Sequence, residues 1–175
     1  LVGSEMCIRD SYNRQSENTF VLDEPELANV REFIRSKIFK FAREIMCSKD
    51  EVIITQSWVN KSGKGESHHE HVHPNSMISG VWYPVINEQL PPIQFRSRAQ
   101  RDIQLSNDKY NNFNSAPFLL PMKMGELSIF PSNLTHSVPA NQSDTERISL
   151  SFNTWVKGSL GDINSLTYLP LDRCV

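Results

Sequence analysis

Apolar residues at helical spacing dominate the first third of the chain. They recur every three or four positions from Leu27 to Ile45, which gives one apolar stripe and one charged face. The segment Asp23-Glu24-Pro25-Glu26 precedes them with a carboxylate cap, a proline for the first turn and acidic groups at the positive end of the helix dipole. The pattern predicts a helix over about residues 24–46. We expect its stripe to be buried in the core rather than to form a partner interface.

From Glu51 onward, short β-rich runs alternate with Asn, Ser, Gly and Pro. The clearest run is Arg147–Val156, in which Ile148, Leu150 and Phe152 alternate with Ser149, Ser151 and Asn153. The other predicted strands are Val52–Asn60, Met77–Ile86, Ile93–Phe95, Phe118–Met122 and Glu126–Phe130. Such a series indicates an antiparallel sandwich or barrel, over about residues 51–157, with the helix covering one sheet. The polar stretch Arg96–Ser115 is predicted to be a long loop.

The composition is typical of a globular protein. The chain has 175 residues, of which 38% are hydrophobic and 22% are charged, enough for one domain with a core. A net charge of -2 offers no basic field for phosphates, so nucleic acid is not a favoured partner. We see no apolar run of about 20 residues for a membrane helix and no signal-peptide pattern, and we therefore expect a cytoplasmic protein. The sequence does not indicate an oligomeric state.

The cysteines and the first residues are expected to have no function. Cys7, Cys47 and Cys174 are far apart and have no CxxC spacing, so neither a disulfide framework nor a thiolate zinc site is indicated. Residues 1–11 (LVGSEMCIRDS) join poorly to the rest of the chain and are expected to be a non-native leader. The single domain is then expected to span residues 12–175.

Four of the five histidines lie within six residues, from His68 to His73. Neutral imidazole is a good ligand for iron, copper, nickel and zinc. In an extended segment alternate residues point the same way, so His69, His71 and His73 are predicted to share one face. His68 and Glu70 are predicted to share the other. The cluster therefore offers an HxH or HxE pair for one metal ion.

A metal site needs a further ligand from elsewhere in the chain, and His136 is the only remaining histidine. It follows a predicted strand, a position that suits a third ligand. Arg147 begins the last predicted strand, where its guanidinium fork can bind a carboxylate, and Ser149 on the same face can add a hydroxyl donor. The alternatives are a solvated histidine loop, a surface His136 and an arginine paired with Glu146 or Asp144.

Together these residues resemble the 2-oxoglutarate and iron(II)-dependent oxygenases. In that family an HxD, HxE or related pair and a distal histidine bind iron, and a later arginine, often in an RxS pattern, holds 2-oxoglutarate. The runs that carry the resemblance are HVHPNSMISGVWY (71–83), MGELSIFPSNLTHSVPAN (124–141) and ERISLSFN (146–153). They are similar to a group of oxygenases common in marine bacteria and phages and related to prolyl hydroxylases. The resemblance covers roughly residues 55–156. It implies a mainly β protein with an N-terminal helix, a double-stranded β-helix of the jelly-roll, cupin-like class.

The resemblance assigns His71 and His136 to iron(II). His73 stands where most relatives have Asp or Glu, which is the main departure from the family pattern. Three candidates for the third ligand stay open: His73 itself, Glu70 in an HxE pair with His68, or water. His73 is preferred because the closer group shows HxHP. Three imidazoles leave the iron with its full +2 charge, which the doubly negative 2-oxoglutarate can compensate.

The resemblance also implies a cosubstrate site and a reaction. Arg147 and Ser149 would anchor 2-oxoglutarate, and Tyr83 resembles a tyrosine that donates to the same carboxylate in prolyl hydroxylases; a core tyrosine is the alternative. With Fe(II), 2-oxoglutarate and O2, the implied activity is hydroxylation of an unknown small-molecule or peptidyl substrate, with decarboxylation of 2-oxoglutarate to succinate. The candidates for apolar walls of the site, or equally for plain core, are Trp82, Phe130, Leu150 and Phe152.

Two other functions stay open. Gly65 followed by His71-x-His73 matches the opening of the cupin pattern, so a cupin-type isomerase or small-molecule binder with another divalent metal is one alternative. Against it, no glutamate follows His73 at the short cupin spacing, and the region before His136 lacks the second cupin motif. A metal-binding module without catalysis is the other alternative.

Overall fold

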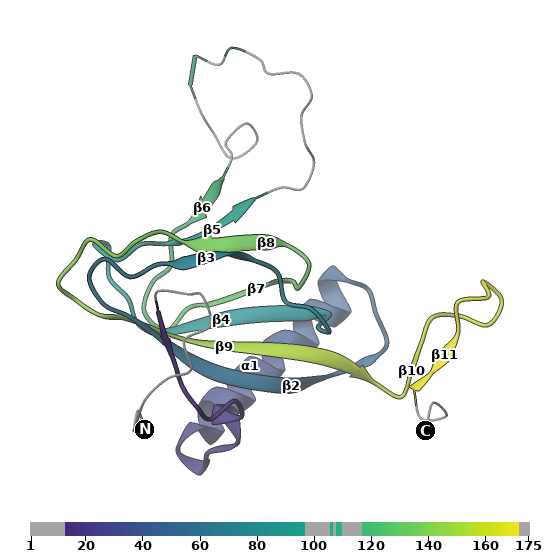
Figure 1. Ribbon diagram of the computed structural model, residues 1–175. Helices are drawn as coiled ribbons and strands as arrows, with labels where there is room; N and C mark the ends of the chain where they lie inside the picture. Colours follow the sequence, from purple (N-terminus) through teal and green to yellow (C-terminus); the bar gives the residue numbers. More distant parts are fainter. Residues whose placement is uncertain (1–12, 97–105, 107, 110–116, 172–175) are drawn as a thin grey trace.

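The computed structural model describes residues 13–96, 106, 108–109 and 117–171. The predicted leader, residues 1–11, lies outside the described residues, as does most of the predicted loop Arg96–Ser115. Cys47 is free and exposed, whereas Cys7 and Cys174 fall outside this part of the chain. Within it, a helix packs on one side of two facing antiparallel sheets (Figure 1).

The N-terminal helical region consists of several consecutive pieces. Two 3-10 turns, η1 (Val21–Asp23) and η2 (Pro25–Leu27), lead into α1 (Ala28–Lys40), and a π-helical turn, η3 (Phe41–Ile45), continues it. The predicted cap at Asp23 is wrong, because Leu27 is the N-cap residue of α1. The Asp23 carboxylate lies 3.5 Å from the Arg31 guanidinium and forms an ion pair with it instead.

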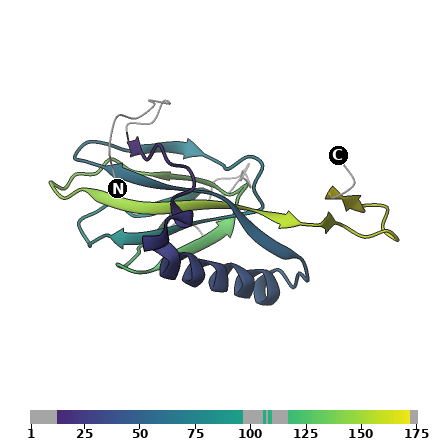
Figure 2. The same cartoon turned by 90° about the horizontal axis from the view of Figure 1, so that it is seen from below.

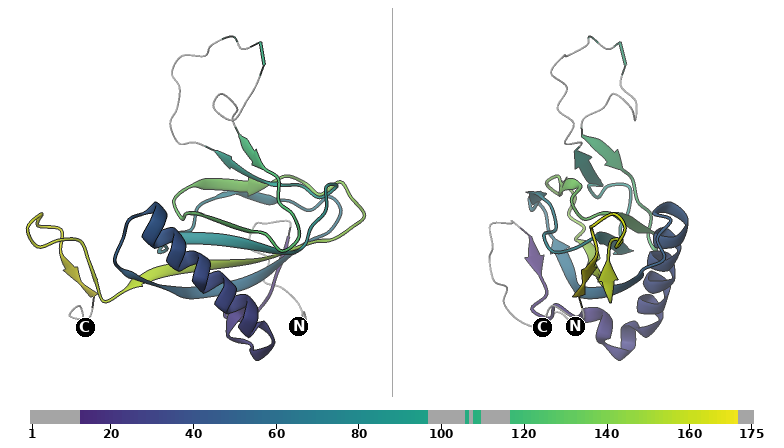
Figure 3. Two further views of the ribbon diagram at one scale, coloured as in Figure 1. Left: turned by 180° about the vertical axis from the view of Figure 1, so that it is seen from behind. Right: turned by 90° about the vertical axis from the view of Figure 1, so that its right-hand side faces the viewer.

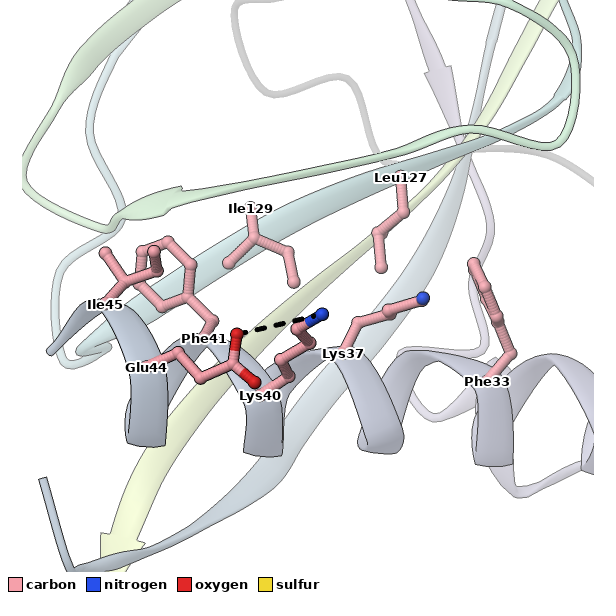
Figure 4. Close-up of a pocket in the computed structure, with 8 residues that line it drawn as sticks. All are labelled: Phe33, Lys37, Lys40, Phe41, Glu44, Ile45, Leu127 and Ile129. Atoms are coloured by element: carbon pink, nitrogen blue, oxygen red, sulfur yellow. Dashed lines mark ion pairs between the residues drawn. The ribbon is translucent and has the colours of Figure 1, made fainter. Parts of the chain in front are cut away.

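Only part of the predicted apolar stripe is buried. Ile34 and Ile38 pack beneath the helix in the core, as expected. Other apolar residues of the helical region line a surface pocket of about 420 Å³ beside the edge strand of the larger sheet (Figure 4). Its lining comprises Phe33, Phe41, Ile45, Leu127 and Ile129, together with Lys37 and the ion pair Lys40–Glu44. The stripe therefore divides between core and surface, because the helix crosses the sheet obliquely (Figures 2 and 3).

The larger sheet has the strand order β1-β2-β9-β4-β7, with antiparallel neighbours throughout. Its strands are β1 (Arg14–Gln15), β2 (Glu51–Ser62), β9 (Arg147–Lys157), β4 (Ile78–Val85) and β7 (Leu127–Pro131). The long pairing of β2 with β9 sets the two strands in register, with one bulge between Ile54 and Gln56. A small hairpin of β10 (Ser159–Leu160) and β11 (Leu169–Pro170) projects beyond the end of β9 (Figure 1).

The smaller sheet has the order β3-β8-β5-β6 and faces the larger one (Figure 1). Its strands are β3 (His68–His71), β8 (Thr135–Val138), β5 (Ile93–Arg96) and β6 (Phe118–Leu120). The two facing sheets and the N-terminal helix confirm the predicted jelly-roll class. All six predicted strands are present with small shifts at their ends, whereas β3 and β8 were not predicted as strands.

Strand alternation divides the core into two clusters. Leu150 and Phe152 of β9 point toward α1, and Trp82 of β4 packs against the same cluster. Of the two roles left open for these three residues, the structure supports plain core, because the larger sheet separates them from the space between the sheets. Phe130 and Tyr83 belong to the second cluster, between the two sheets. Within the described ranges, no helix is long and apolar enough to cross a membrane.

Candidate metal centre and cosubstrate site

The two histidine-bearing segments meet in the smaller sheet. β3 pairs with β8 so that His71 lies directly opposite His136. His73 follows two residues after the end of β3, where its backbone N–H donates to the Ser132 carbonyl at 2.9 Å. The structure thus brings His136 beside His71 and His73, which precede it by more than 60 positions in the sequence.

The predicted alternation within the cluster fails. A register shift between His68 and His71 interrupts the pairing of β3 with β8. As a result, the His68 and His71 rings stack on the same side, with centroids 4.4 Å apart, while His69 and Glu70 are exposed. The Glu70 carboxylate lies 2.9 Å from Nε of Arg96 and forms an ion pair with it.

Among the described residues, His71, His73 and His136 form the one group whose ligand atoms could share a metal ion, all within 4.8 Å of one another. Nε2 of His73 lies 3.1 Å from Nε2 of His136. Two nitrogens bound at right angles to one ion, each at about 2.1 Å, would be about 3 Å apart. The observed separation therefore fits two neighbouring positions on a single ion.

Backbone hydrogen bonds fix the tautomers of two of these rings. Nδ1 of His71 lies 2.8 Å from the His69 carbonyl, and Nδ1 of His136 lies 2.9 Å from the Leu134 carbonyl. A carbonyl only accepts, so each Nδ1 carries the proton and each Nε2 presents a lone pair. This is the usual outer hydrogen bond of a metal-binding histidine.

Burial keeps the three imidazoles uncharged. Desolvation, together with smaller contributions from neighbouring histidines, lowers the pKa of His136 to about 3 and that of His73 to about 4. Desolvation also lowers the pKa of His71, against the effect of its bond to His69. At neutral pH the site therefore offers neutral nitrogen donors, which suit a divalent transition metal such as iron(II).

Arg147 lies at the start of β9 and is buried between the sheets, with 3% of its surface exposed. Its Nη1 donates to Oγ of Ser149 at 3.2 Å, and its guanidinium carbon lies 5.2 Å from the centre of the Tyr83 ring. Desolvation lowers the pKa of Arg147 and raises that of Tyr83. The three residues predicted to bind the cosubstrate are therefore neighbours.

Arg147 has no acidic partner in the part of the chain that the structure describes. The predicted alternative, a pair with Glu146 or Asp144, is wrong: Glu146 lies 2.7 Å from Lys61, and Asp144 lies 2.8 Å from Lys64. Nε of Arg147 and the Tyr83 hydroxyl are buried and make no well-formed hydrogen bond with the described residues, although the two side chains interact with one another. A buried, unpaired cation is costly, so this corner of the site fits the carboxylate of a ligand.

Aromatic rings surround the histidines. The Phe130 ring packs edge-on against His136 at 4.8 Å, which places one of the four predicted wall residues at the site. Trp58 of β2 stacks on His73 at 5.7 Å and was not predicted. Trp58 lies within the run that predicted strand β2. Its place beside His73, however, depends on the register of β2 against β9, which the local sequence does not give.

Comparisons with known proteins identify a family for the chain. The family model described as "Putative 2OG-Fe(II) oxygenase" matches residues 56–153, more than half of the chain. The matched segment begins in β2 and includes the three histidines, Tyr83 and Arg147. A search of curated proteins finds no match.

The fold is similar to that of several solved structures. A 2OG-Fe(II) oxygenase family oxidoreductase from Burkholderia pseudomallei aligns with a TM-score of 0.51 at 14% identity, over 66% of this chain and 50% of that one. A Pseudomonas putida prolyl-4-hydroxylase aligns with a TM-score of 0.54 at 12% identity, over 83% and 71% of the two chains. HygX from Streptomyces hygroscopicus, solved with nickel and 2-oxoglutarate bound, aligns with a TM-score of 0.59 at 7% identity, over 86% and 72%. The chain spans half the length of the Burkholderia protein. At these identities the likeness shows the fold.

Proposed function

Because the chain belongs to the 2-oxoglutarate and iron(II)-dependent oxygenases, we propose that it hydroxylates a small-molecule or peptidyl substrate. In this reaction one oxygen atom of O2 enters a C–H bond of the substrate. The other enters succinate, as 2-oxoglutarate loses CO2. Bound iron(II) supplies the O2 and one-electron chemistry that side chains lack.

His71, His73 and His136 are the proposed iron ligands. Their nitrogen atoms lie together and uncharged, and two of the rings are held by backbone carbonyls with Nε2 facing the shared site. His73 is preferred to Glu70 because Nε2 of His73 lies 3.1 Å from Nε2 of His136, whereas Glu70 is exposed and paired with Arg96. The three imidazoles would hold the ion, and positions not taken by protein ligands would be available to the cosubstrate and O2.

Arg147 is the observation that carries the proposal. A metal-binding cupin has no need of a buried guanidinium without an acidic partner, whereas a 2-oxoglutarate oxygenase needs one for the carboxylate far from the metal. Arg147 would bind this carboxylate through its fork, Ser149 would orient the fork, and the Tyr83 hydroxyl would donate a further hydrogen bond. Phe130 and the apolar cluster around it would exclude water from the reacting atoms.

The test measures metal and cosubstrate binding separately. The protein with iron(II) and 2-oxoglutarate under anaerobic conditions should develop the weak visible band of the chelate. In Arg147→Met, 2-oxoglutarate should bind roughly a hundredfold more weakly, because a charged hydrogen-bonded pair is lost. Iron affinity should be unchanged. Arg31→Met, on α1 and away from the site, is the matched control and should leave both affinities unchanged.

Two outcomes would contradict the proposal. If the unsubstituted protein retains iron but shows neither the band nor a thermal shift with 2-oxoglutarate, the oxygenase function is wrong. If Arg147→Met loses iron and 2-oxoglutarate to the same extent, the arginine supports the fold rather than the cosubstrate. The apo Arg147→Met protein should fold normally, since the substitution removes a buried charge without an acidic partner.

A further inference from the structure

Trp58 carries a buried indole N–H that has no acceptor among the described residues. Four of the described residues have a buried side-chain nitrogen or oxygen atom without a hydrogen-bond partner. They are Asn13, Trp58, Tyr83 and Arg147. Tyr83 and Arg147 are accounted for by the distal carboxylate of 2-oxoglutarate. A buried tryptophan N–H usually finds a partner, and leaving it without one costs about 1–3 kcal/mol. The Trp58 N–H therefore also points to a ligand atom.

The register of β2 against β9 places Trp58 relative to Arg147. Ser62 pairs with Arg147, Asn60 with Ser149, and Trp58 with Ser151. Residues two apart along a strand point to the same side, so these pairs line the space between the sheets. The row runs from Arg147 at one end toward the metal ligands at the other, where Trp58 stacks on His73 at 5.7 Å.

The spacing along this row matches an extended diacid. The Arg147 side chain reaches forward to Ser149, one step along the row. The next step, to Ser151 and Trp58, is about 6.7 Å further. That step is comparable with the separation of the two carboxylates of a five-carbon diacid. With its distal carboxylate on Arg147, such a ligand has its other end beside Trp58.

No neighbouring polar group among the described residues accepts a hydrogen bond from the Trp58 N–H. The Ser151 hydroxyl, directly across from Trp58, already accepts a hydrogen bond from Nδ2 of Asn60 at 2.9 Å. Stacking on His73 explains an aromatic ring at position 58 but not an indole, because phenylalanine would stack as well. The N–H is the feature without a structural explanation.

We propose that Nε1 of Trp58 donates a hydrogen bond to the metal-proximal carboxylate of 2-oxoglutarate, an inference that rests on the proposed function. The bond is charge-assisted and lies in an interior of low dielectric, where such bonds are strong. It holds the chelating end of the cosubstrate beside His73. Trp58 is thus a second anchor of the cosubstrate, complementary to Arg147.

The test uses Trp58→Phe, which keeps the aromatic ring and removes the N–H. Anaerobic titrations with iron(II) present follow the visible band with two ligands: 2-oxoglutarate and 2-oxobutyrate, which lacks the distal carboxylate. Trp58→Phe should weaken both ligands by about tenfold or more, as expected for a hydrogen bond to a charged group, and should shift the band. Arg147→Met should weaken 2-oxoglutarate only.

The control is Trp82→Phe, which removes an indole N–H that donates to the Gly125 carbonyl at 3.2 Å on the surface. It should leave both titrations unchanged. The thermal midpoint of apo Trp58→Phe should not fall, because the N–H has no partner to lose. Unchanged affinities in Trp58→Phe, or a loss confined to 2-oxoglutarate, would overturn this role while the proposed function stands. Absence of the band in the unsubstituted protein would overturn both.

Discussion

His73 is the residue at which this site departs most from the expected family pattern. In the proposed ligand set, an imidazole stands where the family resemblance implies a carboxylate, so the protein ligands would contribute no negative charge. The charge of the metal would then be compensated by the cosubstrate. One of its two carboxylates would bind the metal and the other would bind Arg147. Such a site should hold metal less tightly by itself and bind an anionic cosubstrate more strongly.

The identity of the third ligand can be decided by paired substitutions. His73→Ala should lose metal retention during gel filtration, because two imidazoles remain of the three that lie together. Glu70→Gln should retain metal, because Glu70 is exposed and 2.9 Å from Arg96. Metal content of each purified variant is the measurement, with His69→Ala, an exposed neighbour, as the control. Full metal retention in His73→Ala together with loss in Glu70→Gln would reverse the assignment.

Candidate site residues could be predicted from the sequence where their residue type and neighbouring positions were sufficient. The histidine cluster, His136 and Arg147 stand out by type and position. Trp58 did not, because its role depends on pairing with a strand about 90 positions away. The faces of His68 and Glu70 were predicted wrongly because a register shift in β3 broke the strict alternation on which the prediction depended. Long-range register and irregular pairing are thus the two kinds of information that the local pattern lacked.

Strand β9 positions much of the site, and a cluster of ion pairs lies at its start. Glu146 immediately precedes Arg147 and lies 2.7 Å from Nζ of Lys61 on β2. It also accepts a hydrogen bond from Arg14 on β1 at 3.0 Å. These contacts join three neighbouring strands of the larger sheet at the position where Arg147 enters the interior. Glu146 itself is exposed, so each contact is screened and individually weak.

The Glu146 cluster should make stability depend on pH. Hydrogen bonding to Lys61, followed by that to Arg14, lowers the pKa of Glu146. A carboxyl with a lowered folded-state pKa stabilises the protein above its unfolded-state value, and this contribution is lost as pH falls through the folded-state value. Glu146→Gln should therefore lower the thermal midpoint slightly at pH 7, and the difference should vanish in acid, once the pH is below the lowered folded-state pKa of Glu146. Glu32→Gln, on the exposed face of α1, is the control. A difference that persists in acid would contradict the ionic origin.

The elements with the strongest patterns were predicted well, and the short polar ones were not. β2, β4 and β9 alternate over many residues and were found within two residues of their ends. β3 and β8 consist largely of His, Thr and Ser, and tertiary pairing rather than intrinsic preference makes them strands. The start of α1 differs from the prediction, because two 3-10 turns precede it and Leu27 rather than Asp23 is its N-cap residue.

The larger sheet separates the apolar core beneath α1 from the candidate metal and cosubstrate site. On one side, α1 and the cluster around Ile38 and Phe152 form an apolar core. On the other, the space between the sheets contains Arg147, the three histidines and buried serines. Gly80 of β4 leaves room for the Phe152 ring of the neighbouring strand β9, because a Cβ there would overlap that ring and the Ser128 carbonyl of β7. On this polar side, Nε of Arg147 and Nε1 of Trp58 are buried without a hydrogen-bond partner among the described residues.

Ligand binding should therefore stabilise the fold through the polar side alone. Nickel(II) with 2-oxoglutarate, at about 100 times the dissociation constant, should add about 2.7 kcal/mol to the free energy of unfolding. For a chain of this size that corresponds to a rise of roughly 5–10 °C in the thermal midpoint, and a chelator should reverse it. Ile38→Val should lower the midpoint of the apoprotein, because it costs about 0.5–1.5 kcal/mol in the core beneath α1. The ligand-induced rise should be unchanged in this variant, since the two sites lie on opposite faces of the sheet and their free energies add. A smaller rise in Ile38→Val would show that the two sides are coupled through β9.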